Sequence, residues 1–226
     1  MKKRTVFLSA ILSLIPLSQP LILQTGLVLS TTGLMLAVSE NAYAKNSAFY
    51  YNRGSDKAKK GDYYGAIADF TKAIEINPQN DDAFYNRGNS KIELKDYYGA
   101  IADFSKAIEI RPADDAYYNR GKVKSDLKDD YGAIADYTKA IEINPQYSEA
   151  YLNRGYSKDQ LKDYYGAISD YLKAIEINPV YAKAYLNSSV SKENIGDIKG
   201  ACIDAKKAVS LGEESSENKS WIKENC

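Results

Sequence analysis

The chain of 226 residues contains no histidine. Histidine is the commonest general base in enzymes and the commonest metal-ligating side chain, so its absence argues against acid–base catalysis and against a metal centre. The remaining residues contain no recognisable nucleophile–base pair, metal-ligand cluster or phosphate-binding loop. We therefore predict a protein that is not an enzyme, with no catalytic residue, no metal and no cofactor.

An excess of charge of either sign is also missing. Thirty basic residues stand against 30 acidic ones, which gives a formal net charge of zero. Proteins that bind nucleic acid normally carry a basic stripe that contacts the phosphates. Nucleic acid is therefore excluded as an expected partner.

Cysteine is nearly absent. The two residues of this type are Cys202, in the last repeated segment, and Cys226, at the C-terminus. In an oxidising compartment they can form an intramolecular disulfide, which would close a loop of about 25 residues and stabilise the end of the chain by roughly 3–4 kcal/mol in the chain-entropy model. Two free thiols, or a bond to another chain, remain open alternatives.

Long apolar runs are confined to the N-terminus. Three basic residues, Lys2, Lys3 and Arg4, precede an apolar stretch over residues 6–38, and Ala42-Tyr43-Ala44 follows it. This order is typical of a secretory signal, so we expect residues 1–44 to be removed near Ala44 and the protein to be exported to a periplasm, a lumen or the extracellular space. Because the stretch is long and is interrupted by Pro16 and Pro20, an uncleaved membrane anchor is the alternative, and only that segment would then contact a membrane.

The rest of the chain is repetitive. The phrase YNRG or LNRG, or its variant LNSS, recurs with its asparagine every 33 or 34 residues, at Asn52, Asn86, Asn119, Asn153 and Asn187. Within each copy, apolar residues at steps of three and four predict two amphipathic helices, an aspartate such as Asp96 caps the second helix, and a proline such as Pro112 follows it. Repeats of this length build stacked helical arrays. The predicted fold is thus an all-α solenoid of five helix-turn-helix units: 47–80, 81–113, 114–147, 148–181 and a degenerate 182–215.

The residues that recur in each unit resemble the tetratricopeptide repeat. That repeat has a bulky residue, a small residue four positions later, an alanine, an aromatic residue, a second alanine and a closing proline. In the second unit these are Phe84, Gly88, Ala100, Phe104, Ala107 and Pro112. The resemblance implies a right-handed superhelix whose first helices line a concave groove that holds a peptide or a partner protein. The N-terminal segment, the YNRG phrase and the GACIDAKKAVSLG ending resemble exported tetratricopeptide proteins common in cyanobacteria.

The fifth unit lacks the small glycine, the aromatic residue and the proline. A terminal unit has no successor to pack against, so this loss is typical of a cap. We expect residues 216–226, with Trp221 and Ile222, to form a short helix over the open end, because an uncovered apolar face promotes aggregation.

Charged residues also form columns. An arginine follows each YN dipeptide or LN dipeptide of the first four units, and an aspartate lies 16 residues later. These predicted structural ion pairs are Arg53 with Asp69, Arg87 with Asp103, Arg120 with Asp136, and Arg154 with Asp170. A half-buried arginine needs a partner, and a carboxylate that accepts two hydrogen bonds is the best one. A lysine column, which includes Lys91, is expected to lay its stems on apolar surface and to direct its ammonium groups to solvent or to a neighbouring acid.

The asparagine column supplies the predicted ligand-binding residues: Asn52, Asn86, Asn119, Asn153 and Asn187, with Tyr51, Tyr85 and Tyr118 beside them. In the tetratricopeptide family this position of the first helix faces the groove. An asparagine there can offer a carbonyl and an amide to the backbone of an extended peptide. Tyrosine suits protein recognition because it is rigid and amphipathic. The alternative is that these residues are packing residues inherited by duplication.

We therefore expect a non-catalytic scaffold whose partner is a protein or an extended peptide. Acidic groove residues, Asp115, Asp126, Glu149 and Asp159, favour a partner with basic residues. A membrane-anchored assembly or maintenance factor is the alternative, and an enzyme is a remote third.

Overall fold

The computed structural model describes residues 21–22, 28–29 and 46–226. It separates into two units, residues 1–46 and residues 47–226. In the first unit, strands β1 (Leu21–Ile22) and β2 (Val28–Leu29) pair antiparallel, with Leu21 opposite Leu29. The expected signal segment and its cleavage site lie almost wholly outside the described residues. Among those described, no helix is long and apolar enough to span a bilayer.

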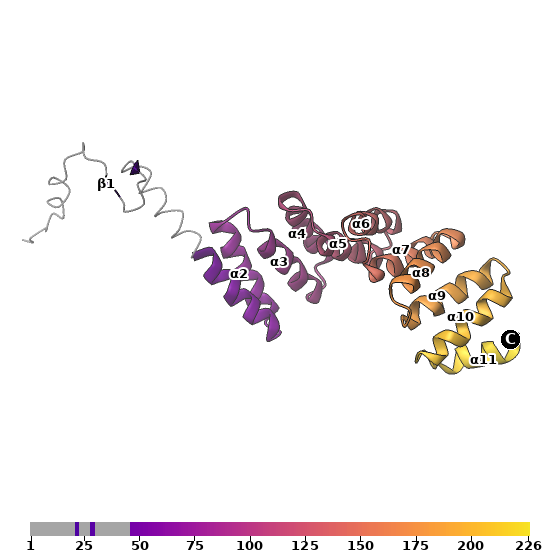
Figure 1. The fold of residues 1–226 in the computed structure, drawn as a ribbon. Coiled ribbons are helices and arrows are strands. Elements are labelled where there is room, and N and C mark those ends of the chain that lie inside the picture. The colour runs from indigo at the N-terminus through magenta and orange to yellow at the C-terminus, as the bar shows by residue number, and fades with distance from the viewer. Residues whose placement is uncertain (1–20, 23–27, 30–45) are drawn as a thin grey trace, which may run out of the picture. The chain divides into compact units, whose positions relative to one another are not determined.

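The second unit is a single row of helices that pack against their neighbours along the chain (Figure 1). Residues 46–59 are helical and are followed by α2 (Tyr63–Ile76). The next pairs are α3 (Asp81–Glu93) with α4 (Tyr97–Ile110), and α5 (Asp114–Asp126) with α6 (Asp130–Ile143). The last two are α7 (Ser148–Gln160) with α8 (Tyr164–Ile177), and α9 (Ala182–Asn194) with α10 (Ile198–Ser210). The prediction of an all-α solenoid of about five helix-turn-helix units is confirmed.

The second helix of every unit begins at the predicted aspartate. In α4 the Asp96 carboxylate accepts a hydrogen bond from the Gly99 amide at 3.0 Å, and a Cβ added at Gly99 would lie only 2.1 Å from the Asp96 Oδ2 atom. The same cap is formed by Asp62, Asp129, Asp163 and Asp197. The glycine of the GAI phrase is therefore required by the cap itself.

The core lies between the helices of each unit and at the boundary with the next unit. Ala100 and Phe104 of α4 are fully buried and pack against Val123 of α5. A Cβ added at Gly88 would lie 3.0 Å from the Phe104 ring, so the small residue of α3 leaves room for the aromatic residue of α4. These contacts explain why the small and aromatic positions recur together.

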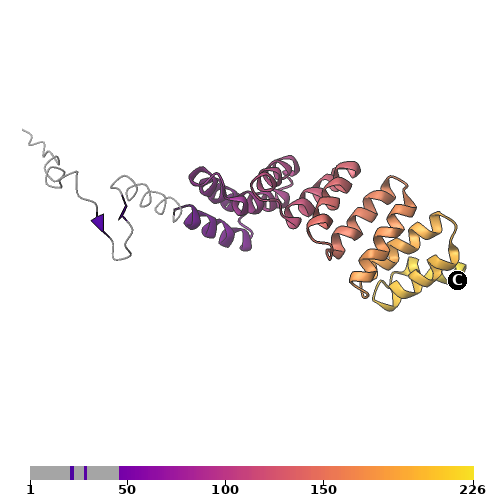
Figure 2. The same cartoon turned by 45° about the horizontal axis from the view of Figure 1, so that its top comes forward.

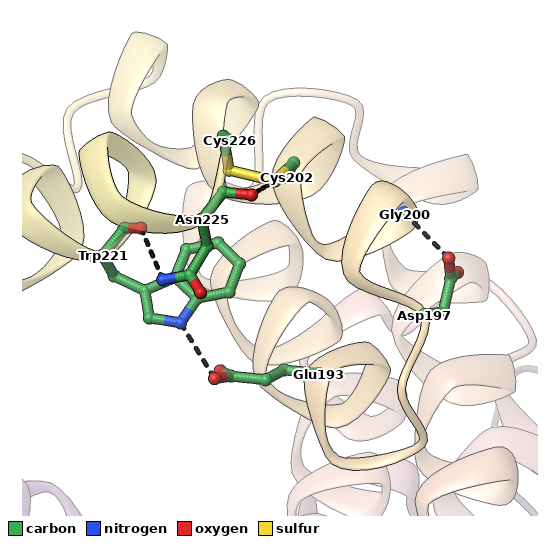
Figure 3. Close-up of a disulfide and its surroundings, with 7 residues drawn as sticks. All are labelled: Glu193, Asp197, Gly200, Cys202, Trp221, Asn225 and Cys226. Carbon is green, nitrogen blue, oxygen red and sulfur yellow. Dashed lines mark hydrogen bonds between the residues drawn. A yellow bond between two sulfur atoms is a disulfide. The ribbon is translucent and has the colours of Figure 1, made fainter.

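The C-terminal helix α11 (Ser216–Asn225) packs beside α10, as Figure 2 shows from a second direction. Ser215 caps it by accepting a hydrogen bond from the Asn218 amide at 3.0 Å. The Trp221 indole donates to a Glu193 carboxylate oxygen at 2.9 Å, and a disulfide joins Cys202 of α10 to Cys226 (Figure 3). No residue of α11 is fully buried, although Trp221 and Ile222 are partly buried, so these polar and covalent links add to its packing against α10.

Three lysines in the turns between paired helices have a left-handed backbone conformation. The φ angle is +60° at Lys95, +66° at Lys128 and +63° at Lys162, whereas glycine occupies the equivalent position in the first and fifth units, as Gly61 and Gly196. A residue with a Cβ is strained in this region, and glycine is not.

Replacing Lys128 by glycine is therefore expected to raise the free energy of unfolding by about 0.5–1 kcal/mol, because the steric cost exceeds the extra entropy of the unfolded chain. Urea denaturation measures the change. The matched control is Lys122→Gly, at an exposed position inside α5, which should lower stability by about 1 kcal/mol. Equal destabilisation by both variants would show that the turn is not strained.

Candidate protein-binding groove

Each of the first four units contains a buried carboxylate that binds two cations. In the second unit, Arg87 donates from Nε and Nη2 to the two oxygens of Asp103 at 2.9 and 2.6 Å, and the Lys91 ammonium lies 2.8 Å from Oδ2. Asp103 is only 3% exposed. The same arrangement joins Arg53 and Lys57 to Asp69, Arg120 and Lys124 to Asp136, and Arg154 and Lys158 to Asp170. All four predicted arginine–aspartate pairs are thus in contact, and the lysine column binds the same aspartates.

The fifth unit keeps the carboxylate after losing the arginine. Asp204 accepts a hydrogen bond from the Ser188 hydroxyl at 2.6 Å and pairs with Lys192 at 2.6 Å. In the first unit, the hydrogen bonds from Arg53 are the main reason that the pKa of Asp69 falls to about 2. These carboxylates are therefore structural, and their charge is satisfied inside the solenoid.

Three of these arginines also link their unit to the preceding one. The Nη1 atom of Arg87 donates to the Thr71 hydroxyl at 3.0 Å, and the guanidinium lies over the Phe84 ring, 5.4 Å from its centroid. Arg120 donates likewise to Ser105, and Arg154 to Thr138. This contact between units was missed from the sequence, although a hydroxyl residue recurs 16 or 15 positions before each of these arginines.

The predicted groove residues bind one another across unit boundaries. The side-chain amide of Asn86 donates to the Tyr51 hydroxyl at 3.0 Å, that of Asn119 to Tyr85 at 2.8 Å, and that of Asn153 to Tyr118 at 2.8 Å. At least one N–H of each amide is therefore engaged within the protein. Among the described residues, the Oδ1 atoms of these three asparagines accept no hydrogen bond, so the carbonyl is the group left for a ligand.

The two end members of the asparagine column lie outside these pairs. Asn187 cannot form the bond because the preceding unit has Leu152 in place of the tyrosine. Asn52 belongs to the first unit, so no earlier unit supplies a tyrosine. Both line hollows in the surface. The hollow at Asn52 has a volume of about 630 Å³ and is also lined by Tyr51, Asn86 and Lys59. The hollow at Asn187 has a volume of about 260 Å³ and is also lined by Asp159.

A third hollow, of about 210 Å³, lies between the second and third units. It is lined by Tyr85, Arg111 and two pairs of aspartates, Asp81 with Asp82 and Asp114 with Asp115. Arg111 binds both Asp81 and Asp82, and the Tyr147 hydroxyl donates to Asp115 at 2.9 Å. Within the described part of the chain, no group of three or more acidic or cysteine side chains is placed to hold a metal ion.

A column of exposed tyrosines was also missed. Tyr64, Tyr98, Tyr131 and Tyr165 are 74–78% exposed near the start of the second helices. The residue that precedes each of them is more buried, and Tyr97 packs against the core formed by Ala100, Phe104 and Val123. The tyrosine that follows this position faces solvent in all four units, three of which have a Tyr-Tyr dipeptide and one Asp130-Tyr131.

The sequence matches two models of one repeat family. A model described as TPR repeat matches residues 54–94, and one described as tetratricopeptide repeat matches residues 81–114, 115–147 and 148–181. Together the matches run without a gap from residue 54 to residue 181, which is more than half of the chain. No curated protein matches the sequence.

Solved structures share the fold. The MamA protein has 26% sequence identity and a TM-score of 0.71, over 76% of this chain and 95% of its own. YrrB, described as a TPR protein with an unusual peptide-binding site, has 23% identity and a TM-score of 0.71, over 84% of this chain and 97% of its own. PilF of Pseudomonas aeruginosa has 17% identity and a TM-score of 0.68, over 78% and 81%.

Proposed function

Because the chain belongs to the tetratricopeptide repeat family, we propose that it is a non-catalytic scaffold that holds an extended segment of a partner protein in its groove. Tetratricopeptide units act typically as protein-interaction scaffolds. The observation that carries the proposal is the line of asparagine carbonyls at Asn86, Asn119 and Asn153, each oriented by a tyrosine of the preceding unit. Acceptors at this regular spacing suit the backbone N–H groups of an extended chain.

The rest of the array supports a binding role for this surface in particular. The interior aspartates, arginines and lysines satisfy one another, so these charges are not available to a ligand. The groups that remain available to a ligand are the asparagine carbonyls and the residues that line the hollows. Tyr85 and Tyr118 add half-buried aromatic area beside the asparagines, and burial raises the pKa of both phenols, which keeps them neutral hydrogen-bonding groups.

The proposal includes the cellular location of the protein. The order of basic, apolar and small residues over residues 1–44 supports export, with a membrane-anchored assembly factor as the alternative. N-terminal sequencing of the protein purified from its native envelope separates the two: a start at Lys45 supports cleavage, whereas an intact N-terminus supports the anchor.

The groove is tested by affinity capture with wild-type protein and the triple variant Asn86→Ala, Asn119→Ala, Asn153→Ala. We expect the triple variant to lose the captured partner, with binding weakened by at least tenfold. The matched control is Tyr51→Phe, Tyr85→Phe, Tyr118→Phe, which breaks the same bonds between units but keeps every carbonyl.

The control separates recognition from packing. If the asparagines bind the partner, the phenylalanine variant should lose stability, by about 1 kcal/mol for each bond, and retain most of its affinity. If the alanine variant captured the same partner with the same affinity, the result would contradict the proposed function. Equal losses in both variants would make the asparagines packing residues.

A further inference from the structure

The acidic residues of the groove differ from those of the interior in one respect. Asp115, Asp126, Glu149 and Asp159 form no ion pair with any described residue, whereas each of the five interior aspartates pairs with at least one cation. The solenoid therefore neutralises this column of five interior aspartates and leaves the four groove carboxylates without a countercharge.

Asp159 stands out among the four because it is half-buried. It lies near the end of α7, where its carboxylate accepts hydrogen bonds from the Tyr171 hydroxyl at 2.6 Å and from the Ser191 hydroxyl at 2.8 Å. These neighbours, on α8 and α9, hold the carboxylate in one position. Both are neutral, so the charge remains uncompensated. A carboxylate offers about four acceptor positions, which leaves room for a further donor.

The surroundings of Asp159 form an open hollow of about 260 Å³. Tyr156 and Tyr164 contribute aromatic rings, and Gln160, Asn187 and Asn194 contribute amide groups. The Asn194 amide donates to the Val190 carbonyl at 2.9 Å, so one of its two N–H groups is already engaged within α9. A carboxylate, aromatic rings and amide oxygens are together the chemistry that binds an ammonium or a guanidinium group.

We propose that this hollow, between the fourth and fifth units, is a pocket for a lysine or arginine side chain of the segment held in the groove. The inference rests on the proposed function and names the chemistry of the partner. Asn187, at its edge, would bind the backbone while Asp159 binds the side chain. Burial raises the pKa of Asp159, and a bound cation would restore the electrostatic stabilisation that burial removes.

Three labelled peptides test the pocket. Each is a capped, extended octapeptide that alternates alanine with lysine, serine or glutamate, and its affinity is measured by fluorescence anisotropy at 150 mM salt. We expect the lysine peptide to bind at least tenfold more tightly than the other two, and Asp159→Asn to abolish this preference. The matched control is Asp126→Asn, which removes an exposed groove carboxylate of the preceding unit and should change the affinity less than twofold.

The outcomes separate the pocket from the groove. Equal binding of all three peptides by the wild type would leave the groove function standing and overturn the pocket. Equal weakening of lysine-peptide binding by Asp159→Asn and Asp126→Asn would also overturn the pocket. The preference for lysine would then come from the general negative charge of the groove. Binding of none of the peptides would contradict both proposals.

A second measurement uses only the wild-type protein, so it does not depend on the variant folding. A carbodiimide joins a carboxylate to an amine in direct contact with it, and mass spectrometry then locates the linked residues. Linkage of the lysine peptide to Asp159 is the expected result. Linkage only to other carboxylates would overturn the pocket.

Discussion

Replacing Asp136 by alanine is expected to lower the free energy of unfolding by about 3–5 kcal/mol, because it leaves two cations without their shared partner. Arg120 and Lys124 both bind this carboxylate, at 2.6 and 2.8 Å, and their side chains are only 17% and 20% exposed. Both cations are mostly buried, so they would be left largely without water or a countercharge. Urea denaturation followed by circular dichroism measures the loss.

Two further variants test the physical reason. Glu142→Ala removes a carboxylate that is more than half exposed and pairs with Lys139 on the helix surface, so the change should stay below about 0.5 kcal/mol. Arg120→Leu should cost less than Asp136→Ala, because Lys124 still neutralises the aspartate. A loss no larger for Asp136→Ala than for Glu142→Ala would mean that the buried cluster does not stabilise the array.

Replacing Cys226 by serine is expected to lower stability by about 3–4 kcal/mol in the chain-entropy model, since the disulfide links residues separated by 24 positions. The loss should be concentrated in α11. That helix has no fully buried residue, and apart from the disulfide its links to the preceding unit are packing against α10 and the hydrogen bond from Trp221 to Glu193. Amide hydrogen exchange should accordingly become fast over residues 216–225 while α5 to α8 remain protected.

The corresponding control is Cys202→Ser, which removes the same bond from its other end and should give the same result. A reductant added to the wild type should reproduce both variants, and should have no further effect on either. Retained protection of α11 after reduction would show that packing alone holds the helix. Alkylated, unlinked cysteines in protein purified from its native compartment would mean that the bond does not form there.

The architecture could be predicted from the sequence because its determinants are local and are repeated. Asp96 and Gly99 lie three residues apart in one turn, and the alternation of small and aromatic residues encodes the packing of α3 on α4. The spacing of 16 residues between Arg87 and Asp103 indicated a contact for the same reason, since it joins two helices of one unit.

Contacts between units were harder to predict, because they depend on how one unit is placed on the next. Nothing in the YNRG phrase indicates that Asn86 reaches the tyrosine of the preceding phrase and not the one beside it. The hydrogen bond from Arg87 to Thr71 also depends on how the second unit is placed on the first. Helical periodicity does place Tyr97 in the apolar stripe with Ala100 and Phe104, but it gives no reason for the exposed tyrosine at position 98.

The hydrogen bonds between units run from the arginine and asparagine of one unit to hydroxyl groups of the preceding unit. This direction determines where an added unit would keep them. A second copy of residues 114–147 inserted after residue 147 would place its arginine beside Thr138 and its asparagine beside Tyr118, while its own hydroxyl groups would meet Arg154 and Asn153. The arginine and asparagine hydrogen bonds would therefore form at both boundaries of the inserted copy. The same copy inserted after residue 181 would meet Leu172 and Leu152, which can accept neither bond. A unit added in the middle of the array would therefore keep both hydrogen bonds at its boundaries, whereas one added before the terminal unit would lose them at its N-terminal boundary.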